Sequence, residues 1–181
     1  MNRILTTLVG KGEIKRMPGV RRVGGFESGS HGYVYMPPKS TTRSRDMHVH
    51  DLVELRVLLA MAAHDGLCGP VTFRPEEQAA LRVGMTPLNP DARLQIQLGA
   101  NLRDCFIELD EGSEWGKRIP GKLRAYSAAH QQWTDGRFPA VVFVVQDAGH
   151  FPYIQRKIME HGGANLFRST HFDQAVQFLT T

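Results

Sequence analysis

Four ionisable residues are spaced along the chain so that they could share one reaction centre. Asp91 follows a proline and opens an alternating segment, and Glu108 with Asp110 closes the next segment. Side chains alternate along a strand with a period of two, so Glu108 and Asp110 point to the same face. Lys122 lies one turn into the helix predicted to follow. The spacing therefore predicts that all four residues converge at the ends of neighbouring strands.

The chemistry of this group is that of a hard divalent cation acting on phosphate. Mg²⁺ or Mn²⁺ prefers oxygen ligands, so Asp91, Glu108 and Asp110 form a predicted metal site. The ion could activate water and polarise a phosphate, and the ammonium of Lys122 could stabilise the developing charge. Each residue alone also has a purely structural interpretation in a turn, a strand end or a helix face. Glu108 favours the shared site, because it lies within an apolar strand where unpaired charge is costly.

Weaker candidates lie on the preceding helix. Glu54 could direct a carboxylate at the strand ends, although a solvated surface position is the favoured interpretation. His48, His50 and Asp51 suggest a metal site, but no third ligand follows at a diagnostic spacing. These residues are therefore secondary to the carboxylates of the strands.

Composition excludes several other classes of protein. Cys68 and Cys105 are the only cysteines and lack a Cys-x-x-Cys spacing, so buried reduced thiols are expected. The sequence contains no Gly-x-Ser-x-Gly elbow and no phosphate-binding loop, which argues against a serine hydrolase or an NTPase. The longest apolar run, near residues 138–145, is too short to span a bilayer, and no signal segment begins the chain. A soluble, cytoplasmic protein without a membrane partner is expected.

Positive charge is concentrated at the amino-terminal end. The formal net charge is +4, yet residues 1–45 hold nine Lys or Arg against two Glu, and the rest of the chain is net negative. A basic segment on a body that is not basic suits contact with DNA phosphates, although a solvated tail would show the same pattern. The predicted DNA contacts are Lys11, Lys15, Arg16, Arg21 and Arg22.

The elements that must position the four residues follow one another in an informative order. Hydrophobic periodicity predicts a helix, three strands, a helix and a strand, with a short helix inserted after the first strand. The expected main elements are residues 50–63, 71–73, 91–98, 105–109, 118–133 and 139–145, with the inserted helix at 75–82. A helix at 151–160, a strand at 165–167 and a helix at 171–179 follow. The apolar strand at 139–145 is expected to be the central one.

A smaller piece is expected before this α/β domain. Residues 2–15 predict a short helix and a turn, and residues 21–35 predict a basic hairpin with a glycine-rich tip. Together these form the second half of a winged helix, whose first half is missing. Either the natural chain extends upstream or the segment is an irregular arm. The expected boundaries are 1–38 for this segment, 39–47 for a polar linker and 48–181 for the α/β domain.

Three stretches of the sequence resemble a known family. Pro90 with Asp91, the run Phe-Ile-Glu-Leu-Asp-Glu-Gly at 106–112 and the run Lys-Leu-Arg-Ala-Tyr at 122–126 look like the replication-relaxation proteins of bacterial plasmids and mobile elements. The resemblance covers most of the chain. It implies a role in plasmid replication or DNA relaxation, with DNA and replication or mobile-element proteins as partners; a homodimer is left open.

The same residues resemble the PD-(D/E)XK nuclease superfamily. The resemblance implies a mixed α/β (α+β) fold with a restriction-endonuclease-like αβββαβ core, Mg²⁺ or Mn²⁺ as cofactor, and Asp91, Glu108, Asp110 and Lys122 as catalytic residues. The chain departs from the motif at Asp110, which stands where the motif has lysine. Catalysis would then need Lys122 to take the place of that lysine. Two functions stay open: a metal-dependent DNA endonuclease, or a catalytically inactive DNA-binding or regulatory module.

Overall fold

A computed structural model describes residues 3–13, 15–16, 35–36, 43–112, 118–163 and 165–181. The chain divides into two compact units, Met1–Glu54 and Leu55–Thr181. The division falls within a helix, α2 (Arg43–His64), rather than in the polar segment 39–47 expected to link two domains. Residues 43–47 belong to this helix although they show no hydrophobic periodicity. Backbone hydrogen bonds can extend a helix through a polar segment, and an apolar pattern is not needed for that.

The first unit is small, and most of its described residues belong to two helical segments and one short strand pair. It contains α1 (Arg3–Gly10), a two-residue pairing of β1 (Lys15–Arg16) with β2 (Tyr35–Met36), and the first half of α2. The β1 and β2 strands are antiparallel. The short helix and turn are thus as predicted, whereas most of the expected hairpin at 21–35 lies outside the described residues.

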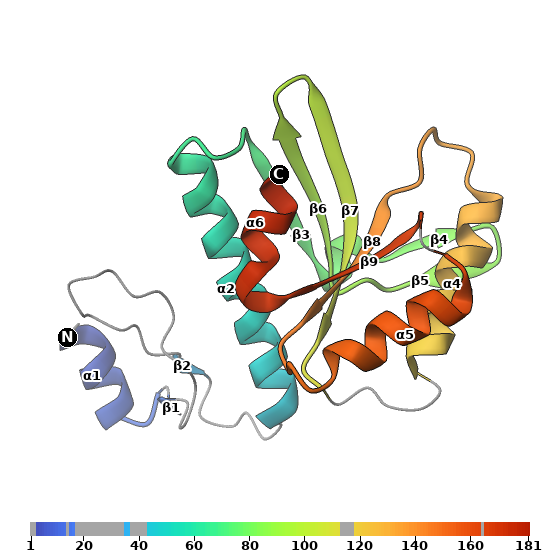
Figure 1. The fold of residues 1–181 in the computed structure, drawn as a ribbon. Helices are drawn as coiled ribbons and strands as arrows, with labels where there is room; N and C mark the ends of the chain where they lie inside the picture. Colours follow the sequence, from blue (N-terminus) through green and yellow to red (C-terminus); the bar gives the residue numbers. More distant parts are fainter. Residues whose placement is uncertain (1–2, 14, 17–34, 37–42, 113–117, 164) are drawn as a thin grey trace. The chain divides into compact units, whose positions relative to one another are not determined.

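The second unit is built on a five-stranded mixed sheet (Figure 1). Its strand order is β3 (Val71–Pro75), β6 (Ala92–Leu98), β7 (Asn101–Asp110), β8 (Ala140–Val145) and β9 (Phe167–His171). The strand β6 runs antiparallel to both of its neighbours, β3 and β7, whereas β7, β8 and β9 are parallel to one another. The middle strand is therefore β7 and not the apolar strand β8 that the sequence suggested. Both strands are buried, so apolar content alone did not distinguish them.

Helices cover the two faces of this sheet. The helices α4 (Arg118–Gln132) and α5 (Phe151–His161) pack against each other on one face, where Phe106, Phe143 and Leu123 belong to one apolar core. The short α6 (Ala175–Thr180), preceded by a 3-10 turn at Phe172–Gln174, contacts β6 and β9 on the other face. Polar residues on β7 that share the face of Phe106 therefore point toward α4 and α5.

The expected order of helix, three strands, helix and strand is present as α2, β3, β6, β7, α4 and β8. The insertion after β3 is larger than expected. It holds α3 (Glu76–Ala79) and a separate hairpin of β4 (Leu81–Val83) and β5 (Thr86–Leu88), and β5 contacts α4. Strands of three residues are too short to show the alternation on which the sequence prediction relied.

Within the described residues, no helix combines the length and the apolar character that crossing a membrane requires.

Candidate active site

Asp91 and Glu108 are brought together by the antiparallel pairing of β6 with β7. Ala92 pairs with Ile107, so one step further along the ladder Asp91 stands opposite Glu108. Residues opposite each other in an antiparallel pair point to the same face. The Oδ2 atom of Asp91 accepts a hydrogen bond from the backbone N–H of Leu109 at 2.7 Å. The aspartate is thereby fixed beside the strand that carries the glutamate.

Glu108 is almost completely buried and is held by two residues of α4. Its Oε2 atom forms an ion pair with Lys122 Nζ at 2.7 Å, and the hydroxyl of Tyr126 donates a hydrogen bond to Oε1. The Glu108 residue is 2% exposed, whereas the Lys122 side chain is 27% exposed. Lys122 and Tyr126 are one helical turn apart, so both reach the same carboxylate. The lysine links the buried charge to solvent.

Burial and a neighbouring charge change the acidity of this carboxyl group. Burial raises the pKa of Glu108 from its ordinary value of 4.5 to about 7; Asp91 adds to the rise, and Lys122 and Tyr126 oppose it. Burial and the charge of Glu108 also raise the pKa of the Tyr126 hydroxyl. The carboxyl group can therefore exchange a proton near neutral pH, a property common among catalytic groups.

Asp110 lies on the same face of β7 but takes a different partner. Its Oδ2 atom is hydrogen-bonded to Nδ1 of His150, the residue just before α5, and accepts the backbone N–H of Gly112 at 3.3 Å. Both Asp110 and His150 are buried, and the His150 ring stacks on Tyr153 with centroids 4.9 Å apart. Asp110 Oδ1 has no hydrogen-bond partner among the described residues.

No family model, curated protein or solved structure matches this chain.

The geometry of the side chains must therefore carry the functional argument. Asp91, Glu108 and Lys122 lie together as the sequence predicted. Asp110 does not join them as a ligand: within the described part of the chain, the only group of three or more metal-ligating side chains whose atoms come within 4.8 Å is His50, Asp51 and Glu54.

The donor chemistry of Asp91 and Glu108 suits a divalent cation in part. Both offer hard oxygen atoms from adjacent strands, and Asp91 also lines a cavity of about 270 Å³ together with Glu76 and Glu77. This cavity gives a cation a route to Asp91 along an acidic wall. Glu108 would have to exchange its contact with Lys122 for one with the ion. Two of the three predicted ligands thus come from neighbouring strands.

Two residues of this site, Tyr126 and His150, were not predicted as functional. Tyr126 lies four residues after Lys122, and this helical spacing places both on one helix face. His150 follows β8, which is parallel to β7, and the carboxyl ends of parallel strands meet at one edge of a sheet. Helical spacing and sheet topology could have indicated both residues.

The predicted DNA-contacting residues are only partly described. Lys11 is exposed just after α1. Lys15 and Arg16 form β1, but their side chains lie outside the description, and Arg21 and Arg22 lie outside the described residues altogether.

Among the cysteines, Cys105 is buried and Cys68 is half-buried, and both are free thiols. Burial raises the pKa of the Cys105 thiol to about 12, which leaves it unreactive.

Proposed function

We propose that this chain is a DNA-binding protein whose α/β domain hydrolyses phosphodiester bonds with the help of Mg²⁺ or Mn²⁺. The observation that carries the proposal is the convergence of Asp91 and Glu108, from adjacent strands, with Lys122 from the following helix. The order of elements around them supports a restriction-endonuclease-like core, and we include this core in the proposal. Asp91, Glu108 and Lys122 are its catalytic residues.

The two carboxylates differ in what they contribute. Asp91 is half-buried, faces the acidic cavity and is fixed by the Leu109 N–H, so it presents an oxygen where a cation can enter. Glu108 lies deeper and supplies the second ligand. A cation held by this pair would polarise the phosphate and lower the pKa of a bound water. Asp110 contributes indirectly, by anchoring the carboxyl end of β7 to the start of α5 through His150.

Lys122 has two roles in this proposal. In the resting protein its ammonium neutralises Glu108, which would otherwise be a buried and uncompensated charge. Because its side chain is 27% exposed, the same ammonium can contact a phosphate that approaches from solvent. It then stabilises negative charge developing on the phosphate oxygens. This is the role that a lysine two residues after Glu108, where Asp110 stands, would otherwise fill.

The basic amino-terminal segment provides the DNA affinity in this proposal. Residues 1–45 carry nine Lys or Arg against two Glu, and neutralising phosphates releases counterions and makes affinity depend on salt. The proposed contacts are Lys11, Lys15, Arg16, Arg21 and Arg22, on a partial winged helix. Together with the family resemblance, they favour a cytoplasmic protein of plasmid or mobile-element replication or DNA relaxation, acting with other replication proteins.

A second candidate function is a catalytically inactive module that binds DNA or a replication protein. The observation that favours it is that both carboxylate oxygens of Glu108 have partners. Tyr126 donates a hydrogen bond to one oxygen and Lys122 forms an ion pair with the other, while His150 is hydrogen-bonded to Asp110. A carboxylate so fully engaged can have a structural role alone. Only cleavage distinguishes this function from the first one, because both predict salt-dependent DNA binding.

The test is cleavage of supercoiled and linear DNA with and without Mg²⁺ or Mn²⁺. Asp91→Asn and Glu108→Gln keep the shape of each side chain and remove its charge, and we expect either to reduce metal-dependent nicking at least 100-fold. Glu160→Gln is the control, since Glu160 is an exposed carboxylate that is also paired with a lysine. DNA binding and thermal stability are measured in parallel. Intact binding by a folded wild-type protein that nicks with neither metal would overturn the enzymatic function and support the second candidate.

A further inference from the structure

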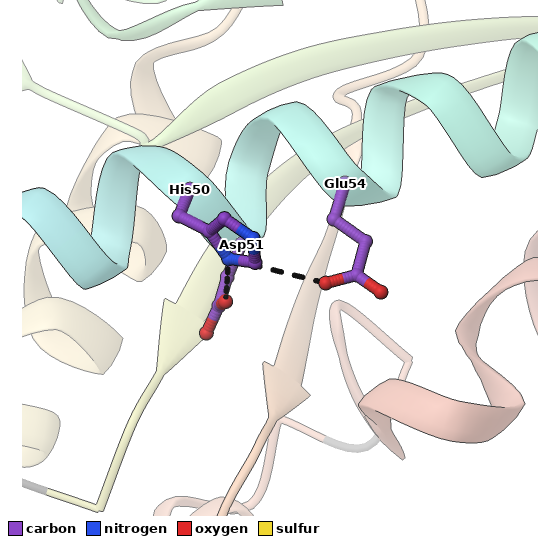
Figure 2. A group of neighbouring side chains, drawn as sticks. All are labelled: His50, Asp51 and Glu54. Atoms are coloured by element: carbon purple, nitrogen blue, oxygen red, sulfur yellow. Dashed lines mark hydrogen bonds and ion pairs between the residues drawn. The ribbon is translucent and has the colours of Figure 1, made fainter. Parts of the chain in front are cut away.

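A histidine and two carboxylates gather on α2, apart from the residues used above (Figure 2). His50 Nδ1 lies 2.8 Å from Asp51 Oδ1 and 3.9 Å from Glu54 Oε2. The side chains of His50 and Asp51 are 4% and 10% exposed, and that of Glu54 is 19% exposed. His50 and Glu54 are one helical turn apart, so the helix itself places both on one face.

These distances suit ligands of a single small cation. Zn²⁺ binds an imidazole nitrogen or a carboxylate oxygen at about 2.0 to 2.2 Å, which separates neighbouring ligand atoms by roughly 3 to 3.5 Å in a tetrahedral site. The observed separations, 2.8 Å and 3.9 Å, lie on either side of that range. Modest rotation of the Glu54 side chain, which is the most exposed of the three, would equalise them.

The surroundings of the imidazole give a second and independent observation. The His50 ring is buried, and its Nε2 atom has no hydrogen-bond partner among the described residues. No described contact on that edge of the ring therefore fixes which nitrogen carries the proton. With the proton on Nε2, the lone pair of Nδ1 faces the carboxylate oxygens of Asp51 and Glu54. In that tautomer the three atoms converge as lone-pair donors, which is the arrangement that a bound metal ion requires.

The donor set of the cluster suits a divalent transition metal. One imidazole nitrogen and two carboxylate oxygens are ligands that such ions accept in proteins. The imidazole favours Zn²⁺ or Co²⁺ over Mg²⁺, which takes oxygen ligands. Three protein ligands leave the remaining coordination positions to water.

We propose that His50, Asp51 and Glu54 form a binding site for a divalent transition-metal ion of the Zn²⁺ class. The site is independent of the proposed cation at Asp91 and Glu108, since it uses different residues and a different ligand chemistry. The alternative to a metal site is a hydrogen bond without a metal, in which His50 carries the proton on Nδ1 and donates it to Asp51 Oδ1. The two arrangements predict opposite results in a metal titration.

The experiment is a titration of the full chain, stripped with a chelator, with Co²⁺ followed by visible absorption, and then displacement by Zn²⁺. Wild-type protein is expected to bind one equivalent and to gain thermal stability with Zn²⁺. His50→Gln and Glu54→Gln should each weaken binding at least tenfold. His130→Gln, which alters an exposed histidine outside both proposed sites, should bind as wild type does.

Two results would overturn the site: absence of saturable binding, or binding that neither His50→Gln nor Glu54→Gln weakens. Because the Glu54 side chain is the most exposed of the three, at 19%, Glu54→Gln should fold even if His50→Gln does not, and its titration then decides the question. The titration measures binding of the metal alone and the cleavage assay measures nicking of DNA, so each proposal can fail without the other.

Discussion

Glu108 shows how one buried carboxylate can be maintained inside a sheet. Lys122 and Tyr126 offset much of the cost of removing it from water, but burial still raises its pKa to about 7. Removing either partner would leave a buried charge that proteins tolerate poorly. The residue thus makes the protein less stable once it ionises, a cost consistent with a functional role.

The raised pKa of Glu108 predicts how stability changes with pH. The folded protein keeps this proton up to about pH 7, and the unfolded chain releases it near 4.5. The stabilisation is therefore complete below pH 4.5 and is lost as the pH rises through 7. A shift of this size corresponds to about 3 kcal/mol. Relative to Glu108→Gln, the free energy of unfolding of the wild type should fall by that amount over this window.

Urea unfolding at several pH values measures this difference. Glu160→Gln is the comparison, because Lys157 lowers the pKa of the exposed Glu160 and no fall between pH 4.5 and 7 is expected there. A difference between wild type and Glu108→Gln that stays constant across the window would show that Glu108 ionises as an ordinary carboxyl group.

The positions of Asp91, Glu108 and Lys122 could be predicted from local patterns. Alternation along each strand and the hairpin between them determine the register, and register places Asp91 opposite Glu108. The partner of Asp110 could not be predicted so directly. His150 reaches it only because α5 begins where β8 ends beside β7, which depends on the order of strands across the sheet.

At the scale of elements, the carboxyl ends of β7 and β8 meet tightly at Gly112. Gly112 has a φ of +84°, and a Cβ atom there would lie 2.7 Å from Oδ2 and 2.8 Å from Cβ of Asp147. The Asp147 side chain is itself held, because its Oδ1 atom accepts the backbone N–H of Gly149 at 2.8 Å. Glycine here lets the loop after β7 pass the turn that leads into α5.

Gly112→Ala should therefore destabilise the fold more than a glycine replacement without a clash. Gly99→Ala is the matched control: its φ is +57°, but no atom lies within 4 Å of the added Cβ. Left-handed backbone alone costs an alanine about 1 to 2 kcal/mol, and overpacking adds about 1 to 3 kcal/mol. Chemical denaturation of both variants tests this order. Equal losses would mean that the Asp147 turn moves aside freely.

Strong periodic elements were predicted well, and weakly patterned ones were not. The strand β6 and the helices α4 and α5 carry long apolar patterns and lie close to the predicted residues, whereas β7 begins at Asn101, four residues before the predicted start. The start of α2 at Arg43 was missed because residues 43–47 are polar. The β4 and β5 hairpin was missed because each strand has three residues. The prediction of helices and strands relies on the length of an element and on its apolar spacing, and these segments lack one or the other.

At the scale of the whole molecule, two parts with opposite charge have separate tasks in the proposal. The basic amino-terminal segment holds DNA phosphates, and the net negative remainder contains the proposed catalytic centre. Such a division lets affinity and cleavage vary independently. A change at the centre should abolish cleavage and leave salt-dependent DNA binding nearly unchanged, because counterion release depends on the basic residues.

The most direct test of this account is the rate at which Lys122→Met nicks supercoiled plasmid in Mg²⁺ or Mn²⁺. Lys157→Met is its matched control: Lys157 is 26% exposed and lies 2.6 Å from Glu160, much as Lys122 is 27% exposed and lies 2.7 Å from Glu108. The account predicts a loss of at least 100-fold for Lys122→Met in folded protein that still binds DNA, and a wild-type rate for Lys157→Met. Equal nicking by the two variants, or none by the wild type with either metal, would contradict it.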